Sequence, residues 1–256
     1  MMKRIDIETA ELLDREACRI NNRGFIDSDP VQFPRRFERL EDIEITALLS
    51  ATIAWGNRKM ICSNCEKMLA LMGDSPYEFT MDRAWEEIDP DQNIHRTFFG
   101  RNLQYYLRGL YEVYSRYGSL QNLGRAMHIE KEELPAWSLV KHLSDILKDA
   151  NDRRSDSRCL PSSLETTALK RINMALRWLV RNDGIVDIGV WDVIKPSQLY
   201  IPLDVHVSNT ARSLGILERK SNDRKAVQEI TESLRSLRPD DPVIYDYALF
   251  GIGMNL

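Results

Sequence analysis

The chain has 256 residues, of which 43% are hydrophobic and 29% charged, and its formal net charge is −4. This length suits one domain or two closely joined ones, and the composition argues against a disordered chain. The acidic net charge argues against a protein that binds nucleic acid over its whole surface. Because the sequence has no long apolar run, no secretory signal at its start and no disulfide framework among its four cysteines, we expect a cytoplasmic protein with no membrane partner.

Apolar residues recur at helical spacing along most of the chain. In chain order, these stripes lie within residues 43–54, 60–72, 103–114, 139–147, 169–179, 227–234 and 245–252. Proline-broken loops at 27–34 and 87–91 and a polar loop at 151–158 separate them. No hairpin turn signal stands between alternating runs, and the one strand-like stretch, 198–203, is interrupted by Pro202. The sequence therefore predicts an all-α protein.

Cys62 and Cys65 have the CxxC spacing of metal and redox sites. They lie inside an apolar helical pattern with no second pair, and the four histidines are scattered. Because a structural zinc site needs four ligands, packing of both thiols within a helix is the favoured interpretation, and we expect no metal. The motifs of serine hydrolases, P-loop proteins and dinucleotide-binding proteins are also absent.

Two segments carry the candidate chemistry. Lys170 lies early in the otherwise apolar helical segment 168–181, where a lysine is ordinarily just solvated at the surface. Asp204 follows an extended Ile-Pro-Leu stretch and precedes a helical pattern, which predicts that its carboxylate caps that helix. A capping carboxylate is held rigidly, and catalysis also requires a rigid carboxylate.

Residues 203–207 (LDVHV) and 211–215 (ARSLG) resemble the VDTHV…R…RLG signature of the helix-hairpin-helix base-excision DNA glycosylases. The resemblance implies that Asp204 is the catalytic aspartate. In an archaeal 8-oxoguanine glycosylase subfamily, the nucleophilic lysine lies further upstream than usual and Ile-Pro precedes the aspartate, as residues 201–202 do here. Lys170 stands 34 residues before Asp204, and the resemblance assigns the nucleophile to it.

Two outer segments agree with this resemblance. Residues 44–51 are similar to the superfamily's early helix, whose end inserts a residue into the base stack, so Trp55, Asn57 and Arg58 become candidate contacts. Residues 247–253 are similar to the segment after which some relatives place iron–sulfur cysteines; none follow here, and no cluster is expected. As a whole, the chain also resembles a bacterial family of unknown function that is assigned to this superfamily.

The resemblance implies two helical subdomains with a DNA-binding groove between them. Residues 41–198 would form a central, barrel-like subdomain that carries Lys170, while residues 1–40 and 199–256 would form a discontinuous one that carries Asp204. One departure is clear, because residues 162–169 lack the glycines of the hairpin signature LPGxGxxTA. In the family these glycines let backbone amides approach a phosphate, so we expect an atypical hairpin.

The implied function is that of a base-excision-repair DNA glycosylase with AP-lyase activity. It would act as a monomer, without a cofactor, on double-stranded DNA that contains a damaged base, and an oxidised purine such as 8-oxoguanine is the first candidate. Asp204 would stabilise positive charge on the sugar and act as general base, while Lys170 would attack the anomeric carbon. Further candidates for contact with DNA or the base are Arg153, Arg154, Arg171, Trp178 and His206.

Local charge is compatible with this function. Between Asn151 and Asn182, seven basic and three acidic residues give a local charge of +4, so the acidic total does not exclude a nucleic-acid partner. Two alternatives stay open: a nucleic-acid-binding module that kept the fold without the chemistry, and a helical scaffold or regulatory protein in which Lys170 is merely solvated. An enzyme requires Lys170 and Asp204 to meet at one site, which separates these alternatives.

Overall fold

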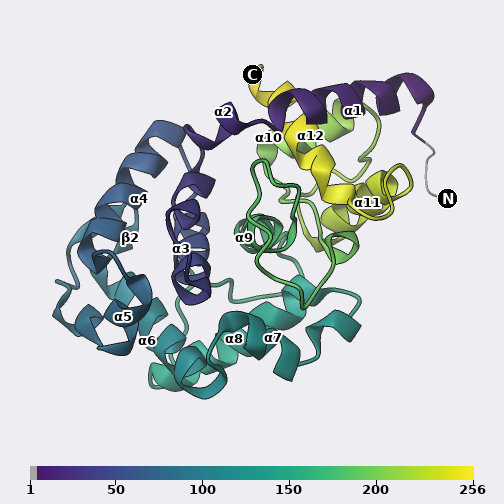
Figure 1. Ribbon diagram of the computed structural model, residues 1–256. Coiled ribbons are helices and arrows are strands. Elements are labelled where there is room, and N and C mark those ends of the chain that lie inside the picture. The colour runs from purple at the N-terminus through teal and green to yellow at the C-terminus, as the bar shows by residue number, and fades with distance from the viewer. Residues whose placement is uncertain (1–4) are drawn as a thin grey trace. The chain divides into compact units, whose positions relative to one another are not determined.

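The computed structural model describes residues 5–256, and they form an all-α protein, as predicted (Figure 1). Its α-helices, in chain order, are α1 (Ile7–Ile20), α2 (Arg23–Ile26), α3 (Leu40–Thr52), α4 (Arg58–Met72), α5 (Pro76–Met81), α6 (Gly100–Tyr117), α7 (Leu120–Ala126), α8 (Pro135–Ala150), α9 (Lys170–Val180), α10 (Val205–Ser213), α11 (Arg224–Arg235) and α12 (Tyr245–Met254). Short 3-10 helices connect some of them: η1 (Pro30–Gln32), η2 (Pro34–Arg36), η3 (Ala84–Glu87), η4 (Ile129–Lys131), η5 (Pro196–Gln198) and η6 (Pro242–Ile244). None of the helices within residues 5–256 combines the length and the low polarity that a membrane span needs.

The chain divides into two compact units. Residues 26–164 form one unit, and residues 5–25 join residues 165–256 in the other. The sequence predicted a discontinuous unit of this kind, but with boundaries at residues 40/41 and 198/199. The difference arises because α9 is bound to the C-terminal segment: Arg177 of α9 donates to Asp246 of α12, and Arg181, directly after α9, donates to Asp241 Oδ2 (2.8 Å). Lys170 therefore lies in the same unit as Asp204, which corrects its predicted place in the central subdomain.

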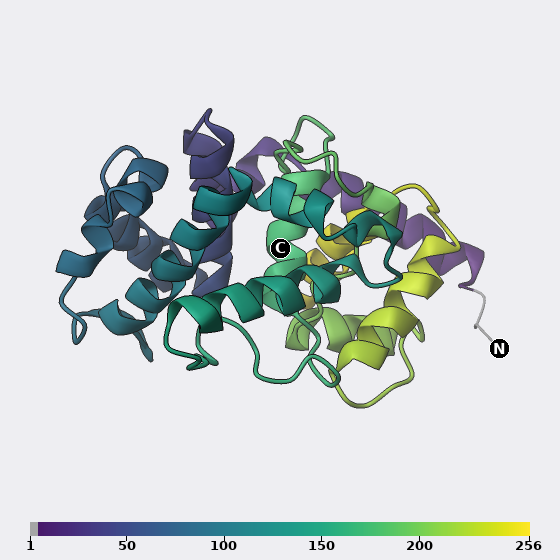
Figure 2. The same cartoon turned by 90° about the horizontal axis from the view of Figure 1, so that it is seen from below.

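Helix α12 is the centre of the unit formed by residues 5–25 and 165–256. Its residues from Tyr245 to Leu249 are buried, as expected for a helix that is mostly apolar on all sides. Helices α1 and α10 pack against it (Figures 1 and 2). Glycine permits these close approaches, because a Cβ atom would lie 2.5 Å from Ile20 Cγ1 at Gly251 and 2.7 Å from Thr210 Oγ1 at Gly253.

Helix α3 is the buried centre of the unit formed by residues 26–164, and every residue from Asp42 to Thr52 is buried. Glu44 of this helix caps α7. Its carboxylate accepts hydrogen bonds from the backbone of Leu120 (2.8 Å) and Gln121 (2.9 Å) and from the Tyr114 hydroxyl (3.2 Å). In the same unit α6 packs against α8.

A short antiparallel hairpin, β1 (Asn93–His95) and β2 (Phe98–Phe99), stands between the helices of residues 26–164. The sequence did not predict it, because the connecting Arg96-Thr97 is not the Asn-Gly type that marks two-residue turns. Arg96 adopts a left-handed φ of 51°, a conformation that favours glycine or asparagine. Tertiary packing therefore decides this turn.

Candidate functional site

Lys170 is the first residue of α9. Leu169 before it has a left-handed φ of 48°, which keeps the preceding chain from continuing the helix. The Thr167 hydroxyl accepts a hydrogen bond from the Leu169 backbone N–H (3.3 Å), and residues 161–169 contain no helix. Lys170 is half-buried. The lysine thus stands at a helix start that is set by a sharp turn of the backbone.

Asp204 is the N-cap of α10, as predicted. Its Oδ1 accepts a hydrogen bond from the Val207 backbone N–H at 3.0 Å. The extended stretch before it is anchored too, because the Ile201 N–H donates to the buried Thr231 hydroxyl at 3.1 Å. Within the part of the chain that the structure describes, Oδ2 of Asp204 has no hydrogen-bond partner. One oxygen holds the side chain in place while the other is available to a ligand.

Lys170 and Asp204 act on the same buried carboxylate, that of Asp246 on α12. Burial raises the pKa of Asp246 from 3.8 to about 7; among its charged neighbours Arg177 lowers that pKa, Asp204 raises it and Lys170 lowers it. The packing of the helices agrees with this: Arg177 of α9, the helix that Lys170 begins, donates to Asp246, and α10, which Asp204 caps, packs against α12. Two residues that are far apart in the sequence thus come together at one electrostatic centre.

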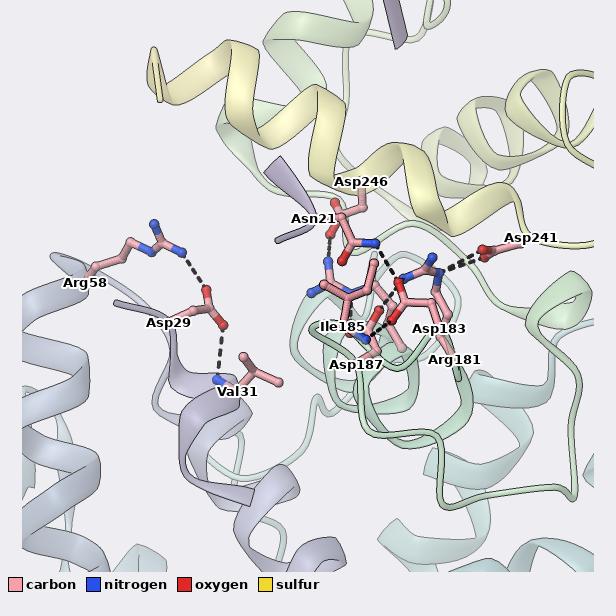
Figure 3. Close-up of polar contacts among 11 residues, drawn as sticks. Asn21, Asp29, Val31, Arg58, Arg181, Asp183, Ile185, Asp187, Asp241 and Asp246 are labelled. Atoms are coloured by element: carbon pink, nitrogen blue, oxygen red, sulfur yellow. Dashed lines mark hydrogen bonds and ion pairs between the residues drawn. The ribbon is translucent and has the colours of Figure 1, made fainter. Parts of the chain in front are cut away.

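Two buried arginines, Arg177 in the last turn of α9 and Arg181 as the C-cap of that helix, hold Asp246 and its surroundings in place (Figure 3). Arg177 and Arg181 are each 4% exposed. Arg177 donates to Asp246 Oδ2 and to Asp187 Oδ1 (3.2 Å), and its guanidinium carbon lies 4.2 Å from the centre of the Tyr247 ring. Burying charges is favourable only where each is paired and hydrogen-bonded, and the arrangement meets this requirement.

Arg181 extends the network to the surface and to the N-terminal segment. It donates to Asp187 Oδ2 (2.8 Å), to Asp241 Oδ2 (2.8 Å) and to Asp183 Oδ2 (2.7 Å). Asp183 also accepts from Asn21 Nδ2 at 2.5 Å (Figure 3). Helix α9, which begins with Lys170, is thereby fixed to α12 and to the end of α1.

The other candidates of this unit differ in accessibility. His206 is exposed in the first turn of α10, and Arg171 is half-buried at the second position of α9. Trp178 corrects the prediction: its side chain is fully buried in the core, with 0% exposure, so it has no free face on which a base could stack.

The candidates at residues 55–58 have structural roles within their own unit. His95 donates from Nε2 to the Trp55 carbonyl (2.9 Å), and its ring lies edge-on to the Trp55 ring at 4.7 Å. Asn57 caps α4, with Oδ1 accepting from the Met60 N–H (3.3 Å). Arg58 pairs with Asp29 at 2.7 Å (Figure 3). These contacts give all three residues a structural role. They do not test contact with DNA, which remains a prediction.

Arg153 and Arg154 are exposed in the turn after α8. Arg153 pairs with Asp149 on the preceding helical turn at 2.6 Å. Arg154, by contrast, has no carboxylate partner among residues 5–256, and it lines a pocket together with arginines of α6. Of these two neighbouring residues, Arg153 is therefore held in an ion pair, whereas Arg154 contributes its guanidinium to a pocket.

The cysteines and histidines do not form a ligand cluster in the described part of the chain. Cys65 is buried in the core, and burial raises the pKa of its thiol to about 12. Cys62 donates from Sγ to the Ser28 carbonyl at 3.7 Å. No group of three or more histidine, cysteine or acidic residues within residues 5–256 is arranged to hold a metal ion.

The comparisons with known proteins place the chain in a family without assigning it an activity. Residues 29–255 match the family described as "Protein of unknown function (DUF2400)". The chain belongs to this family. No curated protein and no solved structure matches it. The range that this DUF2400 chain shares with its family includes Lys170, Asp204 and Asp246, so the candidate site lies within the family's own domain.

A role for Asp246 is not among the predictions from the sequence. The apolar stripe Tyr245, Ala248, Leu249 and Ile252 predicts the helix, but it indicates no role for the acid between them. A lone carboxylate within an apolar helix was the available signal, because such a group is seldom fully buried without a charged partner. The partner, Arg177, lies 69 residues away in the sequence, so only the fold of this DUF2400 chain identifies it.

Proposed function

We propose that this protein is a base-excision-repair DNA glycosylase with AP-lyase activity, of the helix-hairpin-helix superfamily. Its substrate is double-stranded DNA that contains a damaged base, with 8-oxoguanine as the first lesion to test. One observation carries the proposal: Lys170 begins α9, which Arg177 joins to Asp246 of α12, and Asp204 caps α10, which packs against the same α12, so that both residues act on the buried Asp246. A scaffold with a merely solvated lysine does not require this convergence.

Asp204 has the features needed to stabilise a cationic sugar. Breaking an N-glycosidic bond leaves positive charge on the sugar, and a fixed carboxylate lowers the energy of that state. The hydrogen bond from the Val207 N–H fixes one oxygen of Asp204, so little reorganisation is needed when the charge develops. The second oxygen can face the sugar.

Lys170 supplies the nucleophile. Its neutral amine forms a bond to C1′ of the sugar while the bond to the base breaks and the base leaves with the bonding electrons. Asp204 accepts the proton that the attacking nitrogen loses. Opening of the sugar ring then gives a Schiff base, from which β-elimination breaks the 3′ phosphodiester bond. The position of Lys170 at the start of α9, half-buried, suits a lysine that must be partly shielded from water.

Borohydride trapping tests the nucleophile directly. The wild-type protein should form a covalent complex with a duplex that contains one member of a panel of lesions, among them 8-oxoguanine and an abasic site. Lys170→Gln should abolish the complex, because glutamine cannot form a Schiff base. Lys225→Gln, at an exposed lysine of α11, is the matched control and should trap as well as wild type. Absence of trapping on every lesion, or trapping that survives Lys170→Gln, contradicts the lyase proposal.

Asp204→Asn separates the charge of Asp204 from its capping role. Asparagine caps a helix about as well as aspartate, so α10 should keep its stability while the rate of base excision falls on the order of 100-fold or more. The readout is single-turnover base release, with thermal unfolding measured in parallel. Asp6→Asn, at the N-cap of α1, is the control and should leave excision unchanged. Equal excision rates in Asp204→Asn and wild type would exclude Asp204 as the catalytic carboxylate.

A further inference from the structure

A pocket in the unit of residues 26–164 has no role in the chemistry proposed above. It has a volume of about 180 Å³ and is lined by side chains of α6 and of the end of α8 with the turn after it: Arg101, Gln104, Tyr105, Arg108, Asn151, Asp152 and Arg154. The four residues from α6 are spaced i, i+3, i+4 and i+7, so they share one face of that helix, away from its apolar stripe.

The guanidinium of Arg108 is held in one position. Its Nη1 donates to Asn151 Oδ1 at 3.0 Å, and its central carbon lies 5.1 Å from the centre of the buried Trp85 ring. Asn151 cannot turn away, because its amide nitrogen donates to the carbonyls of Tyr105 (3.0 Å) and Leu147 (2.8 Å). A side chain that is positioned before a ligand arrives loses little freedom on binding.

The other two guanidiniums are available to a ligand. Arg101 pairs with Asp91 at 2.7 Å, but the Asp91 side chain is 86% exposed, and such surface pairs are weak enough for an anion to compete. Arg154 has no ion-pair partner in the described part of the chain. The Tyr105 hydroxyl donates to the Arg154 carbonyl at 3.1 Å. Burial raises the pKa of Tyr105 to about 12, so this phenol adds no negative charge to the pocket at neutral pH.

The lining of this pocket contains three arginines and one carboxylate, that of Asp152. Like charges gathered in one place repel each other unless an anion lies between them, and the planar donors of arginine match phosphate oxygens. The volume is below the roughly 300–1,000 Å³ of pockets that hold a whole cofactor, so it suits one charged group. We propose that the pocket formed by Arg101, Arg108 and Arg154 binds a phosphate group. The proposal does not depend on the glycosylase activity.

A phosphate group can come from a nucleic-acid backbone or from a small phosphate compound, and two titrations of the full-length protein distinguish these sources. In the first, inorganic phosphate is added at constant ionic strength, and binding is followed by calorimetry or phosphorus NMR. Arg108→Gln and Arg154→Gln should each weaken binding about tenfold, since each removes a charge-assisted hydrogen bond. Asp152→Asn should strengthen binding several-fold by removing the opposing charge, and asparagine tolerates the left-handed φ of 53° at this position.

The second titration uses an undamaged DNA duplex at several salt concentrations. If the phosphate belongs to DNA, Arg154→Gln should weaken duplex binding and reduce the slope of log affinity against log salt by about one. If it belongs to a small compound, the variants should affect inorganic phosphate alone. Arg116→Gln is the matched control, because Arg116 is exposed on α6, pairs with Glu112 and does not line the pocket.

The proposal is overturned if Arg108→Gln and Arg154→Gln behave like Arg116→Gln in both titrations. Arg154 is exposed and unpaired within residues 5–256, so Arg154→Gln keeps the test decisive even if Arg108→Gln disturbs folding. Failure here is distinguishable from failure of the glycosylase proposal, because borohydride trapping depends on Lys170 and not on this pocket.

Discussion

At the scale of single residues, Asp246 illustrates how burial changes an ordinary acid. The aspartate is 6% exposed, and loss of solvation raises its pKa from 3.8 to about 7 although Arg177 donates to it. The side chain therefore gains and loses a proton near neutral pH, beside both proposed catalytic residues. Its protonation state sets how much negative charge Lys170 and Asp204 experience.

The stability of the protein should depend on pH through Asp246. Because its folded-state pKa is raised, the folded protein binds more protons than the unfolded chain between about pH 4 and 7, and its free energy of unfolding falls as pH rises through this window. Asp246→Asn removes the titration. As pH rises from 4 to 7, the free energy of unfolding of wild type should therefore fall relative to that of the variant, by up to about 4 kcal/mol over the whole window. Urea unfolding at several pH values measures this difference.

Asp223 provides the opposite case as a control. A hydrogen bond and charge from Arg219 hold the pKa of Asp223 at about 2, so its contribution is present above its ordinary pKa and is lost as pH falls toward 2. Asp223→Asn should leave the pH dependence between 4 and 7 as in wild type. Parallel curves for wild type and Asp246→Asn in that window would contradict the assignment of the titration to Asp246.

At the scale of elements, α6 has three distinct surfaces. Its apolar stripe of Leu103, Tyr106, Leu107 and Leu110 enters the core, its polar face lines the arginine pocket, and Gly109 marks its contact with α8. The stripe could be read from the sequence, because helical periodicity is a local pattern. The contact at Gly109 could not, because it depends on how closely α8 approaches.

Gly109→Ala should destabilise the protein. A Cβ at this position would lie 2.4 Å from Leu147 Cδ1 and 3.0 Å from the Leu147 Cα, so the helices must move apart. Overpacking of this kind costs about 1–3 kcal/mol, which exceeds the roughly 1 kcal/mol that alanine gains over glycine in helix propensity. Urea unfolding should show a lower free energy of unfolding for the variant.

Two comparisons test the cause of this loss. Ser115→Ala, at an exposed position of the same helix, should leave stability unchanged or slightly higher. In a protein that already carries Leu147→Ala, Gly109→Ala should lower the free energy of unfolding by less than it does in wild type. The reason is that the truncated side chain leaves room for the new methyl group. If Gly109→Ala lowers the free energy of unfolding equally in both proteins, the close contact between α6 and α8 is not the cause of the loss.

At the scale of the whole molecule, the distribution of charge matters more than its sum. Residues 151–182 carry a local excess of +4 in the sequence, but Arg177 and Arg181 are buried and paired with acids that lie after this stretch. These two arginines stabilise the fold and are not available to nucleic acid. The proposed phosphate contact instead uses exposed arginines such as Arg101 and Arg154, which come from two segments of one unit.

The sequence by itself determined the fold class and the helix cap at Asp204, because helical periodicity and capping depend on residues a few positions apart. It also predicted that Lys170 and Asp204 share one site, but this prediction came from the resemblance to a known family and not from a physical property of the residues. Only the tertiary structure decided that α9 lies in the unit of α10 and α12, that Asp246 is buried beside Arg177, and that three arginines share one pocket. Burial and ion pairing over 69 residues, as between Arg177 and Asp246, arise from packing of distant segments, which no local pattern records.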